Sequence, residues 1–129
     1  MNISRITGIV FFIVFYVPPA VNAQEFTAAD SFNYYYDRNN YAKAIGFWEM
    51  FEKDCRDFEL VKNAGNCYLQ LLDNEKALFY YGLAEKYIVE DVFLNKFKLL
   101  VNRSIAFLSL KKYTETFNAL SEACESEEG

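Results

Sequence analysis

The sequence predicts an all-α fold: a short solenoid of about three antiparallel helix pairs, preceded by a leader segment. Two observations support this prediction. A set of small and large apolar positions recurs after 33 residues and again after 39 residues, and short turn segments divide each occurrence into two helices. Self-similarity with a period in the thirties is typical of helical repeat proteins, because each helix pair buries its apolar face only against its neighbours.

The recurring positions define three copies of one unit. The first copy contains Phe32, Tyr35, Ala44, Trp48 and Phe51, the second contains Gly65, Tyr68, Ala77, Tyr81 and Ala84, and the third contains Ser104, Phe107, Thr116, Leu120 and Ala123. We therefore expect one helical domain at residues 24–125, with repeats at about residues 25–57, 58–90 and 91–125. A disordered acidic tail is expected at residues 126–129.

Residues 1–23 have the pattern of a secretory signal peptide. One basic residue, Arg5, precedes an apolar run at residues 6–17, and small residues at Val21 and Ala23 match a cleavage site. The alternative is an uncleaved membrane anchor, but the run of 12 residues is shorter than the roughly 20 needed to span a bilayer. We expect cleavage after Ala23 and an exported product, periplasmic or secreted, which stays membrane-associated only if the segment is uncleaved.

Six helices follow from the apolar periodicity and the turn residues. They are expected at residues 26–38, 41–54, 58–71, 74–87, 91–110 and 113–124. The turns within the three pairs are Asn39-Asn40, Leu72-Asp73 and Lys111-Lys112. Because the second repeat interval is the longer one, we expect the fifth helix to be extended at its start, over residues 91–96.

The three pairs are expected to pack differently. In the first pair Phe32 is bulky where the other copies have Gly65 or Ser104, so this pair is expected to be splayed or shifted. In the second pair Gly65 and Ala77 let the two helices approach closely. The last helix is polar on one face, which predicts the terminal cap that keeps a solenoid soluble; that face carries Glu115, Asn118, Ser121, Glu122 and Glu125.

Charge and cysteine content exclude several classes of function. The chain has 18 Asp and Glu against 13 Lys and Arg, and an acidic surface without clustered cations disfavours nucleic acid and anionic lipid. Of the three cysteines, Cys67 is expected to be a small buried residue, whereas Cys55 and Cys124 are candidates for exposure. We expect no Cys55–Cys67 disulfide, and no zinc site, because the thiols are dispersed and the chain has no histidine.

The spacing of small residue, aromatic, alanine and aromatic resembles the tetratricopeptide repeat (TPR). The stretch from Asn63 to Leu69, followed by the stretch from Asn74 to Tyr81, looks like a well-formed example. The leader and the Tyr41-Ala-Lys-Ala-Ile segment are also similar to the exported TPR proteins of bacterial aerotolerance operons, the BatE type. The resemblance implies a right-handed solenoid and a role as an envelope scaffold.

In TPR proteins the first helix of each pair lines a concave groove that holds peptides. Carried over to this chain, the resemblance places eleven residues on the groove: Asp30, Asn33, Tyr36, Asp37, Lys62, Asn63, Asn66, Gln70, Lys98, Asn102 and Ile105. Asparagine side chains both donate and accept hydrogen bonds, so they can pair with a peptide backbone. The alternative is that these residues form only the solvated edge of the solenoid.

A subset of the groove resembles part of the carboxylate clamp, which grips the free C-terminus of a partner. Lys62, Asn66 and Asn102 occupy the matching places. The clamp also needs two basic residues from a following repeat, which this sequence lacks, and the missing cations would remove most of the charge-assisted hydrogen bonding.

No enzymatic function is expected, because the chain has no histidine, no Gly-rich phosphate loop and no nucleophile beside a base. No cofactor, metal or small-molecule substrate is expected either. We expect an exported adaptor that binds a peptide segment of an envelope protein in its groove. The alternative is a structural oligomer that associates through its aromatic first helix, where Phe26, Phe32, Tyr34, Tyr35 and Tyr36 crowd together.

Overall fold

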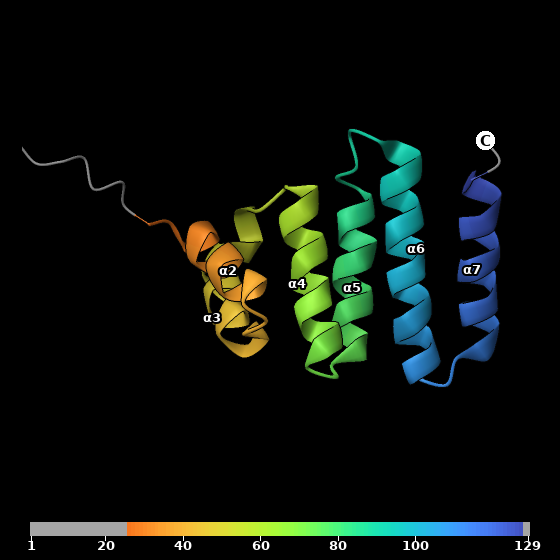
Figure 1. Cartoon of the computed structure of the whole chain (residues 1–129), viewed down its shortest axis with the longest axis horizontal. Helices are drawn as coiled ribbons and strands as arrows, with labels where there is room; N and C mark the ends of the chain where they lie inside the picture. The colour runs from red at the N-terminus through yellow and green to blue at the C-terminus, as the bar shows by residue number, and fades with distance from the viewer. Residues whose placement is uncertain (1–25, 128–129) are drawn as a thin grey trace, which may run out of the picture.

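The computed structural model describes residues 26–127, so the predicted signal peptide lies outside the described residues (Figure 1). The described chain is all-helical. Its elements are α2 (Ala28–Asp37), α3 (Tyr41–Phe51), the short 3-10 helix η1 (Glu52–Asp54), α4 (Phe58–Gln70), α5 (Asn74–Glu85), α6 (Val92–Ser109) and α7 (Tyr113–Glu127). None of these helices is both long enough and apolar enough to cross a membrane.

The helices pack as pairs that stack in chain order. Helices α2 and α3, α4 and α5, and α6 and α7 form the closest contacts, and α3–α4 and α5–α6 contacts join one pair to the next. Figure 1 shows the resulting row of helices from α2 to α7. Since α4 also contacts both α2 and α6, the first helices of the three pairs share one side of the stack. The predicted all-α fold is confirmed, and the pairing is that of a short solenoid.

The turns inside the three pairs repeat one backbone conformation. Asn39, Leu72 and Lys111, which are equivalent in the repeat register, all have positive φ, at 58°, 64° and 59°. The next residue in each turn donates its N–H to a carbonyl five residues earlier, that of Tyr35, Tyr68 and Phe107 respectively. This is the hydrogen bond of a helix that ends through a left-handed residue. The common geometry supports the register on which the three copies were aligned.

Side-chain caps fix where the helices begin. Thr27 and Asp30 form a capping box at the start of α2, in which Thr27 Oγ1 accepts from the Asp30 N–H at 3.1 Å and Asp30 Oδ2 accepts from the Thr27 N–H at 2.9 Å. Asp57 and Asp73 cap α4 and α5 in the same way as single acceptors. Such caps satisfy backbone donors that have no partner inside the helix.

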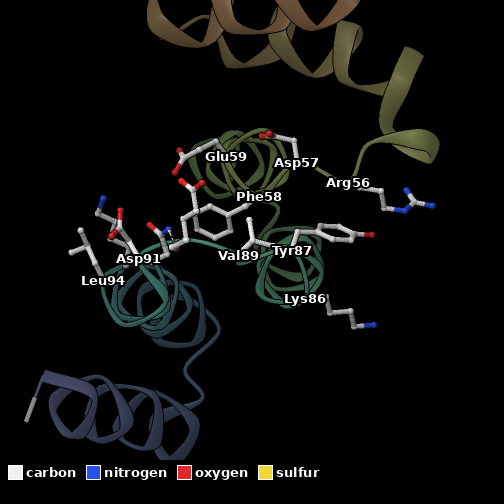
Figure 2. A pocket seen from close by; sticks show the side chains of 12 residues that line it. Arg56, Asp57, Phe58, Glu59, Lys86, Tyr87, Val89, Asp91 and Leu94 are labelled. Carbon is white, nitrogen blue, oxygen red and sulfur yellow. Dashed lines mark hydrogen bonds between the residues drawn. The ribbon is translucent and has the colours of Figure 1, made fainter. Parts of the chain in front are cut away.

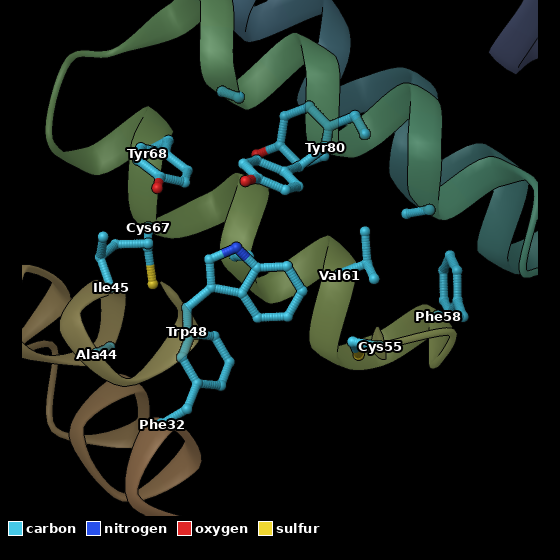
Figure 3. Packing of buried hydrophobic residues seen from close by; sticks show 14 of the residues in the cluster. Phe32, Ala44, Ile45, Trp48, Cys55, Phe58, Val61, Cys67, Tyr68 and Tyr80 are labelled. Carbon is cyan, nitrogen blue, oxygen red and sulfur yellow. The ribbon is translucent and has the colours of Figure 1, made fainter. Parts of the chain in front are cut away.

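The core runs through the first two pairs and reaches the third. Trp48, Tyr81 and Phe32 are its largest fully buried side chains, and Figure 3 shows Trp48 between α2, which carries Phe32, and the second pair. Phe32 packs in the core against Trp48 and Phe51, with ring centres 5.8 and 6.2 Å apart. The bulky residue at this position is therefore buried like its smaller counterparts.

Gly65 is the point of closest approach in the second pair. A Cβ built on Gly65 would lie 2.7 Å from Cε1 and 2.8 Å from Cδ1 of Tyr81. Ala77, on the facing helix, is fully buried. These contacts confirm the reason given above for a small residue at position 65.

Two expectations from the sequence are wrong. Cys55, expected to be exposed, is buried, because the extended residue after η1 turns its side chain into the core beside Phe58 and Val61 (Figure 3). Ser126 and Glu127, expected in a disordered tail, belong to α7. No glycine or proline interrupts α7, and Ser126 Oγ donates to the carbonyl of Ala123. The longer fifth helix is confirmed, since α6 begins at Val92.

The polar face of α7 does not cover the end of the stack as a cap would. Glu115, Asn118 and Glu122 line a hollow of about 200 Å³ that they share with α6. Tyr113 and Phe117 are instead exposed. The last helix therefore carries polar residues on one flank and apolar residues on the other.

Candidate functional site

Side chains from α2, α4 and α6 surround a hollow on the side of the stack formed by the first helices. Its volume is about 250 Å³, and it is lined by Tyr36, Lys62, Asn63, Asn66, Phe97, Lys98, Val101 and Asn102. Six of these eight residues are among those predicted for the groove. The six come from three different helices, so the repeat register brings together residues that are up to 66 positions apart in the sequence.

Asn66 is the centre of a hydrogen-bond network that joins all three helix pairs. Its Nδ2 donates to Tyr36 Oη of α2 at 3.0 Å, and its Oδ1 accepts from Tyr81 Oη of α5 at 2.7 Å and from Asn102 Nδ2 of α6 at 3.0 Å. Burial raises the pKa of Tyr36 and of Tyr81, so both phenols stay neutral and can donate at physiological pH. Asn66 thus has one N–H left for a ligand and acts mainly as a tie between helices.

The lysines of the hollow differ in how far their charge is compensated. Lys62 has a side chain that is only 12% exposed, and its Nζ lies 2.5 Å from Glu59 Oε2. Lys98 is exposed and forms no ion pair within the described residues. Lys98 is therefore the cation in this hollow that is available to a ligand.

Asn63 and Asn102 supply the available amides. Asn63 makes no side-chain hydrogen bond to any described residue, and Asn102 uses only one of its two N–H groups and neither lone pair of its oxygen. Both are half-buried. Together with Lys98 they leave unsatisfied donors and acceptors on the wall of the hollow, as a site for peptide groups requires.

The other predicted groove residues lie outside this hollow. Asp30 is used in the capping box of α2, and its hydrogen bonds with the Thr27 side chain and backbone lower its pKa. The remaining four are exposed along the first helices: Asn33, Asp37, Gln70 and Ile105. Two residues at the positions of the carboxylate clamp are already engaged within the chain. Lys62 is paired with Glu59, and the amide oxygen of Asn66 accepts two hydrogen bonds.

Phe97 and Val101 are the lining residues that the sequence reasoning missed. Both are half-buried on α6 and resemble core residues by type. Their place in the sequence could have indicated this role, because each directly precedes a predicted groove residue, Lys98 or Asn102. They give the hollow an apolar wall beside its polar groups.

A larger hollow adjoins the first at the starts of α4 and α6. Its volume is about 510 Å³, and Figure 2 shows Phe58 and Tyr87 between acidic and basic side chains that include Arg56, Asp57, Glu59, Lys86 and Asp91. Lys98 lines both hollows. The two hollows are therefore neighbours along α4 and α6, one lined by residues of mixed charge and the other by amides.

The acidic residues and cysteines are dispersed over residues 26–127. No group of three or more His, Cys, Asp or Glu side chains lies close enough together there to hold a metal ion. Burial raises the pKa of Cys67 to about 12 and also raises that of Cys55. Neither thiol is therefore ionised at neutral pH, as a nucleophilic cysteine would be.

Replacing Asn66 by alanine is expected to destabilise the fold by about 1–2 kcal/mol. The substitution leaves the hydroxyl of the fully buried Tyr81 without its acceptor, and an unsatisfied buried donor costs free energy. Chemical denaturation measures the loss. A double-mutant cycle with Tyr81→Phe, which removes the orphaned hydroxyl, should return a coupling between the two sites; strictly additive losses would contradict the role given to this hydrogen bond.

Comparison with known proteins gives no relative from which to transfer a function. No family model matches the chain, and no curated protein matches it.

Proposed function

We propose that the protein is a non-enzymatic adaptor of the TPR kind, exported to the cell envelope, that holds an extended peptide segment of another protein in the groove formed by α2, α4 and α6. The observation that carries this proposal is the hollow in which Asn63, Asn102 and Lys98 hold uncommitted donors and acceptors beside the apolar Phe97 and Val101. The resemblance of the sequence to exported TPR proteins supports the location and the class of partner.

The chemistry of the groove suits a peptide backbone with an anionic or polar side chain. Amide side chains hydrogen-bond to backbone groups irrespective of the peptide sequence. Lys98 adds one charge that favours a carboxylate nearby, and the apolar wall accepts one aliphatic or aromatic side chain. The network around Asn66 fixes the three first helices relative to one another, so the groove is held open before a ligand arrives.

The groove is tested by site-specific photocrosslinking in an envelope extract. A photoreactive side chain at Gln70, exposed on α4 in the helical register of Asn63 and Asn66, is expected to form adducts with one discrete protein. The same group at Phe79, which is exposed on the second helix of that pair, is the matched control.

The double substitution of Asn63 and Lys98 by alanine separates binding from folding. Neither side chain makes a hydrogen bond or an ion pair with another described residue, so the melting temperature should stay at the wild-type value while the Gln70 adduct falls at least tenfold. An undiminished adduct in this variant, or equal adducts from Gln70 and Phe79, would remove the groove as the binding site.

A further inference from the structure

The C-terminal end of the stack exposes a surface that is covered at both internal junctions. The second helix of each pair has three equivalent positions in the repeat register. They are Ile45, Trp48 and Glu52 after the first pair, Leu78, Tyr81 and Glu85 after the second, and Phe117, Leu120 and Cys124 after the third. At the first two junctions the first helix of the next pair packs against this second helix.

The third set is more exposed to solvent than the other two. Trp48 and Tyr81 are fully buried, and Glu85 Oε2 lies 3.1 Å from Arg103 Nη1 of the following α6. Leu120, at the position of Trp48 and Tyr81, is 44% exposed, and Phe117 is 70% exposed. Tyr113 continues the same stripe one turn earlier. The stripe of Tyr113, Phe117, Leu120 and Cys124, here termed the α7 stripe, thus matches the junction positions of the other pairs and is exposed in the described part of the chain.

The opposite end of the stack exposes an aromatic side chain at a position that is buried in the two internal first helices. The equivalent positions Cys67 in α4 and Ala106 in α6 hold small, fully buried residues. The equivalent position in α2 is Tyr34, which is 43% exposed. The guanidinium carbon of Arg38 lies 3.6 Å from the centre of the Tyr34 ring.

The order of the helices indicates which helix fits the α7 stripe. At each internal junction a second helix packs against the first helix of the next pair, and α2 is the first helix that no described pair precedes. Helix α7 also contains four glutamates and no lysine or arginine. Two of these, Glu115 and Glu122, lie on the flank toward α6, and α2 carries Asp30 and Asp37, with the cation of Arg38 beside Tyr34 just after its end.

We propose that the α7 stripe is covered by α2 of a second copy of this chain, so that the protein associates head to tail and continues its own stack. The contact joins two different surfaces, so it leaves one free α7 stripe and one free α2 on every dimer. Such an interface builds species larger than a dimer unless the rotation closes a ring.

Sedimentation velocity of the purified protein in reductant tests the proposal. The wild type is expected to shift to larger species as concentration rises. Phe117→Glu, which blocks the α7 stripe, and Tyr34→Glu, which blocks α2, are each expected to stop this growth. Phe79→Glu is the matched control, since Phe79 is 63% exposed on α5 and lies on neither surface.

Mixing the two blocked variants distinguishes the arrangements. Phe117→Glu keeps a working α2 and Tyr34→Glu keeps a working α7 stripe, so an equimolar mixture should form a 1:1 heterodimer and nothing larger. A wild type that stays monomeric would overturn the proposal. So would loss of association in Phe117→Glu with wild-type behaviour in Tyr34→Glu, because that pattern belongs to a symmetric α7–α7 dimer. Circular dichroism checks that each variant folds, with Phe117→Ser as the substitute if the glutamate variant does not.

Discussion

Replacing Trp48 by alanine is expected to destabilise the protein by about 3–5 kcal/mol, a large fraction of the roughly 5–15 kcal/mol that stabilises a typical domain. Trp48 is fully buried at the junction of the first two pairs. Its ring lies 5.8 Å from that of Phe32, 5.2 Å from that of Phe51 and 5.5 Å from that of Tyr80. The substitution removes all three aromatic contacts and opens a cavity where two pairs meet.

The loss should arise from packing rather than from hydrogen bonding. The Trp48 indole nitrogen is buried without a hydrogen-bond partner among the described residues, so deleting its N–H costs no hydrogen bond. Trp48→Phe, which keeps one ring in the core, is therefore expected to lose much less stability than Trp48→Ala. Urea denaturation followed by far-ultraviolet circular dichroism measures both variants, since neither retains the only tryptophan of the chain. Equal losses in the two variants would contradict the packing account.

The helices and turns could be predicted from the sequence because their signals are local. Asn39, Leu72 and Lys111 fall at one position of the repeat, and each adopts the left-handed conformation that ends the first helix of its pair. Only Asn39 is of a type that favours this conformation. For Leu72 and Lys111, the prediction depended on the recurrence of the apolar positions around them. Periodicity therefore located turns that residue type alone would have missed.

The hydrogen bonds of the site could not be predicted, because their partners come from distant segments. Asn66 bonds to residues that are 30, 15 and 36 positions away. The sequence indicated that Asn66 and Asn102 share a side of the stack, but not that they bond to each other. Within the predicted groove, Asn66 therefore holds the helices together, whereas Asn63 and Asn102 keep free groups.

The burial of Cys55 and the orientation of α7 about its axis could not be predicted, for a related reason. Both depend on how a chain end or a connecting segment rotates against its neighbour. Cys55 follows η1 in an extended conformation, which no periodic pattern marks. In α7 the polar residues form a flank that the sequence showed correctly, but the position of α6 decides that this flank lines a hollow and leaves Phe117 exposed.

Replacing Gly65 by alanine is expected to cost about 1–3 kcal/mol, although alanine is the better helix former by roughly 1 kcal/mol. The new methyl group would lie 2.7 Å from Cε1 of Tyr81. Tyr81 is fully buried and its hydroxyl is tied to Asn66 at 2.7 Å. The ring therefore has no room to retreat without breaking the network that joins the three pairs.

Gly46→Ala is the matched control for this prediction, since Gly46 lies in α3 and a Cβ built on it meets nothing within 4 Å. There the helix propensity acts alone, so the variant should gain about 0.5–1 kcal/mol. Urea denaturation of the two variants should thus give changes of opposite sign. A stabilised Gly65→Ala protein would mean that α4 and α5 are not in close contact at this residue, and the repeat register that places Gly65 against Tyr81 would be wrong.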